Sequence, residues 1–272
     1  MTGWQSADMA SVWLKVAEQR NRMMAAATER MFAQAGVREG ARVLDVGTGT
    51  GDTALMLAHR VGPTGEVLAT DMAPAMVSAA ATAARESGFA NVKTSVMDLA
   101  APLGDVGVFD AVVARCVLMF VEGLPDALSR IRGALRPGGR FAAIVWAELE
   151  ANPFNAIPIA AVRNRREMPT PPPELVKAFS LSSAPDLQRT FEGAGFGSVV
   201  VERVTLSREF PGFADAAKVL REIPLYRDLL SLLPEEERRE AVTEIEQGYR
   251  AFVRADGTVA FPQVTLVVAG SA

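Results

Sequence analysis

The sequence predicts an α/β fold, in which a parallel β-sheet is covered by helices on both faces. Between residues 42 and 146, short apolar runs of strand length alternate with segments of helical periodicity. Repeated strand–helix–strand units of this length build parallel sheets, whose crossover helices cover the two faces. The first strand also leads directly into a glycine-rich loop and a helix, which is typical of the ligand site in such sheets.

The first half of the chain has clearly bounded elements. Its first ~35 residues carry apolar residues at three- and four-residue spacing, which predicts helix, and Gly36 and Gly40 end this segment. We then expect strands at 42–46, 66–70, 91–96, 109–114 and 140–146. We expect helices at 52–60, 74–87 and 124–135.

The second half is less regular. Prolines recur from Pro153 to Pro173, so we expect an irregular crossing over 152–177, with short helices at most. The later elements are a helix at 184–194, a strand at 198–206, two or three helices over 213–254 separated by Pro224 and Pro234, and a strand at 264–269.

We therefore expect residues 1–40 to form an N-terminal helical cap and residues 41–272 to form the main domain. This domain would carry cap insertions at about 150–180 and 211–256. The three cap segments are expected to pack together over one edge of the sheet.

Composition excludes several classes of protein. The net charge of −4 argues against a nucleic-acid partner, because phosphates are bound by clustered basic residues. The single cysteine, Cys116, excludes an intrachain disulfide and a multi-cysteine zinc site. The single histidine, His59, excludes a polyhistidine metal site and fits a cation near a helix C-terminus, so we expect no metal. No secretory signal and no apolar run of ~20 residues is visible, so we expect a cytoplasmic protein without stable membrane insertion.

The loop after the first strand contains the most informative motif. Residues 43–51 read V-L-D-V-G-T-G-T-G, with Asp45 just before the glycines Gly47, Gly49 and Gly51. Glycines let the chain turn tightly and let a ligand approach the backbone. A carboxylate at Asp45 would repel a pyrophosphate and attract the sulfonium and ammonium groups of S-adenosylmethionine (SAM). The motif therefore favours SAM over a nicotinamide dinucleotide.

Two further acids end the next strands. Asp71 follows the second strand, where an acid can accept hydrogen bonds from both ribose hydroxyls. The alternative interpretation is that Asp71 belongs to the N-terminal region of the helix that begins at Pro74. Asp98 follows the third strand and could accept from an adenine amino group, with Met72 and Leu99 beside the ring. The alternative for Asp98 is a solvated turn.

Together these residues resemble a known family. The segment 43–51, Asp71, Asp98, F-D-A-V at 109–112 and L-R-P-G-G-R at 135–140 are similar to the motifs of class I SAM-dependent methyltransferases, and within them to the UbiE-like enzymes of ubiquinone and menaquinone biosynthesis. The resemblance covers about residues 41–146. It implies a Rossmann-like seven-stranded sheet, mostly parallel with the last strand antiparallel, and helical cap insertions. The donor-site residues that we expect are Asp45, Gly47, Thr48, Gly49, Gly51, Asp71, Met72, Met76, Asp98, Leu99 and Arg115.

Three other types of methyltransferase are disfavoured. Residues 114–117 read A-R-C-V where amino-methylating enzymes often carry an Asn/Asp-Pro-Pro-aromatic motif, and Asn152-Pro153-Phe154 comes one strand too late for it. Metal-dependent catechol enzymes would need an acidic cluster near the end of the fourth strand, and this chain has Arg115 there instead. RNA cytosine enzymes would need a proline beside Cys116, which we expect to be a packed thiol.

We expect a small, largely apolar or aromatic methyl acceptor, because the cap is rich in large apolar side chains. The candidate substrate residues are Trp4, Met9, Trp13, Phe120, Trp146, Phe154 and Tyr226, any of which could instead be core. Arg163, Arg165 and Arg166 could meet an anionic group or lie on a solvated helix face. No catalytic residue can be assigned; Tyr226, Glu148 and Arg115 are weak candidates for a general base.

Several alternatives stay open at this point. The transfer could be to carbon, oxygen or nitrogen, with S-adenosylhomocysteine (SAH) as the second product. The chain could also bind SAM without transferring the methyl group, or be a nicotinamide-dependent oxidoreductase. We expect a monomer or a homodimer.

Overall fold

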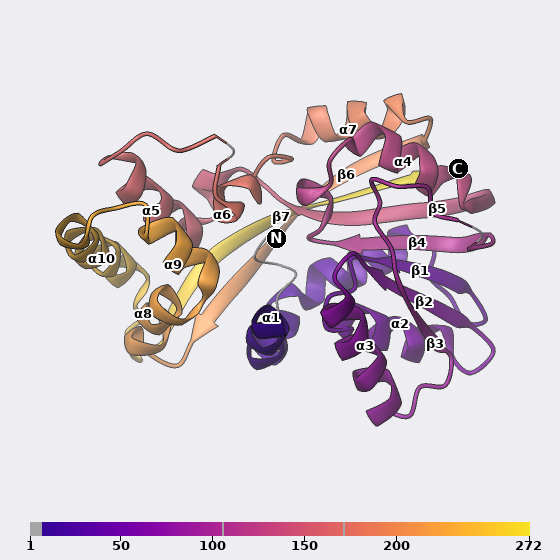
Figure 1. Cartoon of the computed structure of the whole chain (residues 1–272), viewed down its shortest axis with the longest axis horizontal. Helices are drawn as coiled ribbons and strands as arrows, with labels where there is room; N and C mark the ends of the chain where they lie inside the picture. Colours follow the sequence, from indigo (N-terminus) through magenta and orange to yellow (C-terminus); the bar gives the residue numbers. More distant parts are fainter. Residues whose placement is uncertain (1–6, 105, 171) are drawn as a thin grey trace.

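The computed structural model describes residues 7–104, 106–170 and 172–272, with side chains from Ala17 onward outside those gaps. Its centre is a seven-stranded sheet in the order β3-β2-β1-β4-β5-β7-β6 (Figure 1). The strands are β1 (Arg42–Val46), β2 (Glu66–Asp71), β3 (Val92–Val96), β4 (Phe109–Arg115), β5 (Leu135–Trp146), β6 (Gly197–Phe210) and β7 (Val259–Ser271). The five strands β1 to β5 pair in parallel, whereas β7 pairs antiparallel with both β5 and β6. The expected mostly parallel sheet with an antiparallel last strand is confirmed.

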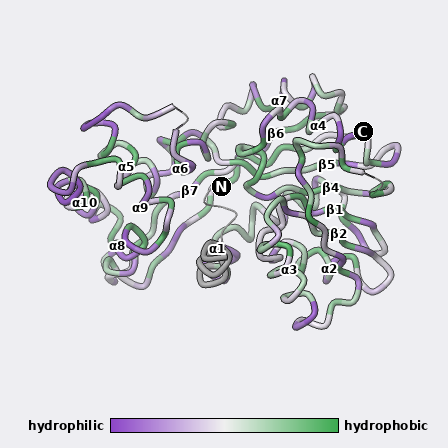
Figure 2. Tube along the Cα trace, in the orientation of Figure 1, coloured by the Kyte–Doolittle hydropathy of each residue, from purple (hydrophilic) through white to green (hydrophobic). Residues whose placement is uncertain are grey.

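Helices cover both faces of this sheet, and β4 shows why. Its alternate residues point to opposite faces, so Val112 belongs to one apolar cluster and Val113 to another. On one face lie α1 (Ala7–Gln34), α2 (Asp52–Val61) and α3 (Pro74–Glu86), and on the other α4 (Leu124–Gly133) and α7 (Ala184–Gly193) (Figure 1). The central strands carry mostly hydrophobic colour along their length (Figure 2). This double burial explains their nearly continuous apolar runs.

A second lobe forms where β6 and β7 extend past the end of β5. The last residue of β5, Trp146, pairs with Thr265, which pairs with Val204 on β6. The β6–β7 ladder then continues to Phe210 and Val259. Around this extension lie α5 (Pro153–Arg163), α6 (Glu174–Lys177), α8 (Phe213–Glu222), α9 (Pro224–Leu230) and α10 (Glu235–Tyr249), which share a third apolar cluster (Figure 1). The two strands are longer than the predicted 198–206 and 264–269.

The prolines of the crossing after β5 do not prevent a regular helix, which corrects the expectation of short helices at most. The helix α5 has 11 residues and contains Pro158. Proline cannot donate to the carbonyl four residues earlier, which is that of Phe154. The buried hydroxyl of Tyr249 donates to this carbonyl at 2.6 Å, so the missing backbone hydrogen bond is replaced from α10.

The helix α1 packs on the sheet, and its expected place in a common cap stays a prediction. The described part of α1 contacts β5, β6 and β7, and its residues Met24, Met31 and Phe32 are buried in the cluster on that face of the sheet. Its apolar side chains recur at helical spacing and therefore form one stripe that packs on the strands. Of the two or three helices expected between 213 and 254, three are present as α8, α9 and α10. No described helix is both long and apolar enough to cross a membrane.

Candidate active site

The candidate site lies at the carboxyl edge of the parallel strands. There β1 runs into the glycine loop, β2 ends at Asp71 and β4 ends at Arg115. The register places these ends side by side, because Val46 pairs with both Thr70 and Ala114. Ligands of open α/β sheets bind outside this edge.

The glycines of the loop have two different roles. A Cβ atom on Gly47 would lie 2.5 Å from Cγ2 of Val117, in the segment after β4, so Gly47 allows close packing. A Cβ atom on Gly49 would meet no atom within 4 Å. Both residues have positive φ, of 65° and 56°, which favours glycine. The loop is therefore packed at Gly47 and open at Gly49, where a ligand can approach the backbone.

Asp45 is an unusual group at this edge. Asp45 is only 1% exposed, and its Oδ2 atom has no hydrogen-bond partner. Burial raises the pKa of this carboxyl from 3.8 to about 7, and the nearby Thr48 hydroxyl and Arg115 guanidinium offset part of the rise. No hydrogen bond of regular geometry joins Asp45 to Thr48, whose Oγ1 atom also lacks a partner. Buried polar groups normally have partners, so these atoms suit a bound ligand.

Asp71 is tied to the loop and to the start of α3. Its Oδ2 atom accepts from the Gly49 N–H at 3.0 Å, and its Oδ1 atom accepts from the Ala73 N–H at 3.0 Å. Burial raises the pKa of this carboxyl, and these backbone donors oppose the rise. The structure thus shows the helix-start role of Asp71, while a carboxylate has further lone pairs for a ribose. The ribose role stays a prediction.

The expected adenine residues lie on the segments that follow β2 and β3. Met72 is 49% exposed, whereas Met76 on α3 and Leu99 are buried. Asp98 is exposed and accepts from the Ala100 N–H at 2.9 Å, which is the geometry of the turn that we gave as the alternative. Its contact with an adenine stays a prediction.

Arg115 joins β4 to α1, which sequence reasoning did not anticipate. Its side chain is 9% exposed and donates to Oδ1 of Asn21 at 3.1 Å and to Oγ1 of Thr28 at 3.5 Å. Asp52, the first residue of α2, lies 3.7 Å from Arg115 and also forms an ion pair with Arg20. Burial lowers the pKa of Arg115, as does the neighbouring Arg20. This cluster holds α1 against the site.

The expected substrate residues fall into three groups. Trp4 lies outside the described residues, as do the side chains of Met9 and Trp13. Phe120 and Trp146 are partly buried and pack where the sheet core meets the core of the second lobe. Phe154 and Tyr226 are buried inside the second lobe, where the Tyr226 hydroxyl donates to Oδ1 of Asn155 at 2.5 Å. In this conformation these last two rings have a packing role and offer no open face to a substrate.

None of the three candidate bases fits that role well. Glu148 pairs with Arg203, which holds the pKa of the carboxyl below its ordinary value. Burial raises the pKa of Tyr226 to about 12, so its hydroxyl keeps its proton at neutral pH. Arg115 is engaged in the cluster described above. Burial likewise raises the pKa of the Cys116 thiol to about 11, in agreement with a packed thiol.

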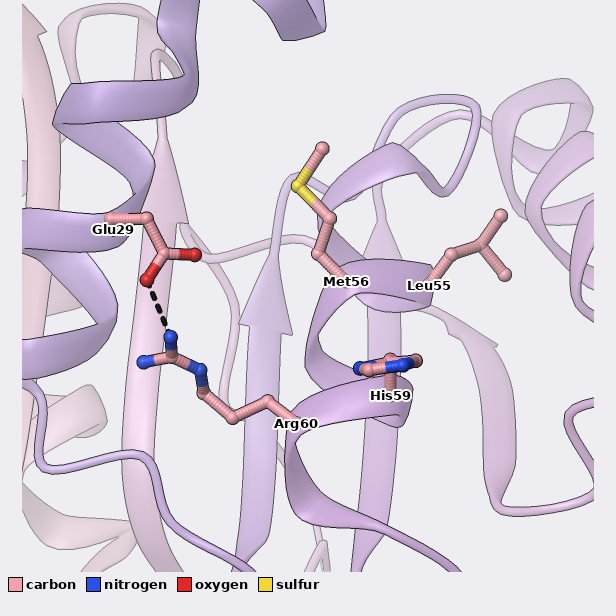
Figure 3. A pocket seen from close by; sticks show the side chains of 5 residues that line it. All are labelled: Glu29, Leu55, Met56, His59 and Arg60. Atoms are coloured by element: carbon pink, nitrogen blue, oxygen red, sulfur yellow. Dashed lines mark hydrogen bonds and ion pairs between the residues drawn. The ribbon is translucent and has the colours of Figure 1, made fainter.

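His59 lies away from this edge. It is in the last turn of α2, and α2 begins at the glycine loop. Together with Glu29, Leu55, Met56 and Arg60 it lines a surface hollow, across which Arg60 pairs with Glu29 (Figure 3). This hollow is therefore separate from the candidate site.

Comparisons with known proteins agree with the geometry. A family model described as a methyltransferase domain matches residues 38–170. Aklanonic acid methyltransferase DauC from Streptomyces sp. (strain C5) is 34% identical over 166 residues, which are 58% of this chain and 75% of that protein. Demethylmenaquinone methyltransferase from Symbiobacterium thermophilum is 35% identical over 113 residues, which are 40% of this chain and 44% of that protein, so the match spans less than half of its length.

A solved structure shares the fold. The YcgJ protein from Bacillus subtilis superposes with a TM-score of 0.60 at 18% identity, covering 91% of this chain and 98% of YcgJ. At this identity the likeness concerns the fold alone. It extends over the second lobe as well as the sheet.

Proposed function

The chain belongs to the SAM-dependent methyltransferases, and from that premise we propose that it transfers a methyl group from SAM to a small, largely apolar or aromatic acceptor. Two of the relatives are named for aklanonic acid and demethylmenaquinone as acceptors, both small molecules. A nucleic-acid acceptor is not part of the proposal, since the net charge is −4. A cytoplasmic location and a monomeric or homodimeric state belong to the proposal.

The buried Asp45 carboxyl, whose Oδ2 atom lacks a hydrogen-bond partner, is the observation that carries this proposal. Burying a carboxylate with incomplete compensation is costly, and a cationic ligand relieves the cost. SAM brings two cationic groups, whereas a dinucleotide brings a pyrophosphate. The residues present therefore fit SAM. In our proposal Asp45 and the backbone at Gly49 hold its amino-acid part, Asp71 the ribose, and Met72, Met76, Asp98 and Leu99 the adenine.

When bound, SAM supplies a methyl group on a sulfonium, which is already a good leaving group. The chain itself then mainly has to align the acceptor and exclude water. Alignment of this kind can supply about 7–11 kcal/mol. Arg115 contributes by holding α1 beside the donor site, and Phe120 and Trp146 provide an apolar boundary toward the second lobe. We assign no general base.

Ligand binding gives the first test. We expect SAH, measured by isothermal titration calorimetry, to bind and to raise the melting temperature, because a ligand of the native state stabilises it by mass action. NADH should do neither. Asp71→Ala should weaken SAH at least tenfold, the scale for losing a charge-assisted hydrogen bond. Binding of NADH in place of SAH would contradict the proposal.

Transfer is tested separately. Incubation with SAM and panels of quinols, phenols, indoles and aromatic acids, followed by mass spectrometry, should show an acceptor gaining one methyl group together with equimolar SAH. The product's bond would decide between carbon, oxygen and nitrogen. If SAH binds but no acceptor in these panels is methylated, a SAM-binding protein without transfer becomes the better description.

A further inference from the structure

The extension of β6 carries a cation on an otherwise apolar strand face. Residues two apart along a strand share a face, so Val204, Leu206, Arg208 and Phe210 point to one side. Leu206 belongs to the cluster beneath α1, and Phe210 belongs to the core of the second lobe. Arg208 is thus placed between two apolar clusters, where an apolar residue would be expected.

The contacts of Arg208 are with aromatic rings. Its guanidinium carbon lies 4.0 Å from the ring centre of Phe154 and 5.5 Å from that of Phe210. Its guanidinium also lies within hydrogen-bonding reach of the Tyr226 hydroxyl, and both its charge and this contact oppose the rise in the pKa of Tyr226 that burial causes. Ring faces compensate only part of the loss of water around a half-buried cation.

Arg208 lacks an acidic partner in the described part of the chain. Its neighbour Glu209 pairs with Arg254 instead. The three arginines that sequence analysis considered for an anion differ from it. Arg165 pairs with Glu244 and Arg166 donates to the Leu232 carbonyl, whereas Arg163 is exposed on α5. The structure therefore moves the candidate for anion binding from those arginines to Arg208.

The strand segment that carries Arg208 lies against the same helix as the candidate donor edge. Val204 is level with the end of β5, and Arg208 is four residues further, or ~13 Å at the usual rise of a strand. The side chain of Gln19 donates to the Glu209 carbonyl at 2.9 Å, so α1 lies against the strand at this point. The same helix contacts Arg115 at the donor edge. Figure 1 shows α1 between the sheet domain and the second lobe. The donor edge and Arg208 thus lie along one helix.

We propose that Arg208, beside the Tyr226 hydroxyl, binds a carboxylate of the methyl acceptor, so that the enzyme prefers acidic aromatic compounds over neutral ones. This rests on the proposed function, because it concerns the acceptor of that reaction. The planar guanidinium can donate two parallel hydrogen bonds to a carboxylate.

A matched pair of probes tests the proposal. With the protein saturated in SAH, the dissociation constants of 2-naphthoate and 2-naphthamide are measured by calorimetry. The two have nearly the same shape and differ in charge. We expect naphthoate to bind roughly 10–100-fold more tightly, the range for a charge-assisted hydrogen bond. Arg208→Met should abolish this preference, whereas Arg163→Met, at an exposed arginine of α5, should keep it.

Each outcome decides the matter. Equal dissociation constants for the two probes in the unaltered protein, or no measurable binding of either, would overturn the proposal, as would a preference that survives in Arg208→Met. If Arg208→Met fails to show a cooperative melt, the unaltered protein and Arg208→Lys decide, since lysine keeps the charge and should keep a reduced preference. SAH binding without an acid preference refutes the anion subsite alone, whereas failure to bind SAH refutes the proposed function.

Discussion

Asp45→Asn is expected to stabilise the ligand-free protein at alkaline pH and to change its stability little near pH 4. The pKa of the Asp45 carboxyl is about 7 in the folded chain, against an ordinary 3.8, because burial disfavours its charge. Between these values the folded state binds more protons than the unfolded state, so the free energy of unfolding falls as the pH rises. Above pH 7 this loss of stability is complete. Asparagine does not ionise, so the substituted protein does not lose stability over this pH range.

The magnitude follows from the interval between the two pKa values. Each pH unit corresponds to ~1.4 kcal/mol, so an interval from 3.8 to about 7 gives a difference of ~4 kcal/mol at pH 8. Acids that do not interact with Asp45 titrate alike in both proteins and cancel in the comparison. At pH 8 the substituted protein should therefore unfold at a higher urea concentration.

The assay is urea unfolding at pH 4.5, 6, 7 and 8, without SAM or SAH, for both proteins. Asp256→Asn serves as a control of opposite sign. Hydrogen bonds from Thr258 lower the pKa of that exposed carboxyl, so its removal should slightly reduce stability above pH 4. Parallel pH profiles for Asp45→Asn and the unaltered protein would refute the reasoning.

The same substitution should weaken SAH. The carboxylate that destabilises the free protein is the group that a bound cation relieves, so stability and binding are expected to change in opposite directions. Loss of one charge-assisted hydrogen bond corresponds to a roughly tenfold or larger rise in the dissociation constant. Unchanged SAH affinity at pH 8 would remove Asp45 from the donor site.

Two further substitutions test packing. Gly47→Ala should lower both stability and SAH affinity, because the new methyl group would meet Val117 at 2.5 Å in a backbone with positive φ. We expect the free energy of unfolding in urea to fall by ~2 kcal/mol or more. An unchanged free energy of unfolding would contradict the close packing. Tyr249→Phe should cost about 1–3 kcal/mol, since it leaves the buried Phe154 carbonyl without a donor. In a protein that already carries Pro158→Ala, Tyr249→Phe should lower the free energy of unfolding by less, because the restored N–H of residue 158 can reach the Phe154 carbonyl. Equal losses of stability with and without Pro158→Ala would argue against this account.

Much of the sheet and of the donor edge could be predicted from local pattern. The alternation of strands and helices, the glycine loop and the acids Asp45, Asp71 and Asp98 all depend on residues close together in the chain. The periodicity of apolar residues, the turn-forming residues and the helix caps each depend on a few neighbouring residues, so they can be recognised before the fold is known. The resemblance to a family added the antiparallel last strand.

The contacts that complete the candidate site depend on residues far apart in the chain. Arg115 and Asn21 are separated by 94 positions, and Tyr249 and Phe154 by 95. No local pattern indicates such pairs, or that β6 and β7 extend past β5 to support a second lobe. The burial of Phe154 and Tyr226 is of the same kind, because an aromatic side chain looks alike in a sequence whether it lines a pocket or fills a core.

Local pattern therefore determined the elements and pointed to the candidate donor loop. Tertiary structure alone decided which charged groups have partners. Asp45 stands out in the sequence by its place before the glycine loop, whereas Arg208 does not stand out at all. The lack of a hydrogen-bond partner at Oδ2 of Asp45 and of an acidic partner for Arg208 became known only from the fold, which removes water from around both groups in the described part of the chain. Desolvation depends on everything packed around a group, and that is a property of the whole fold.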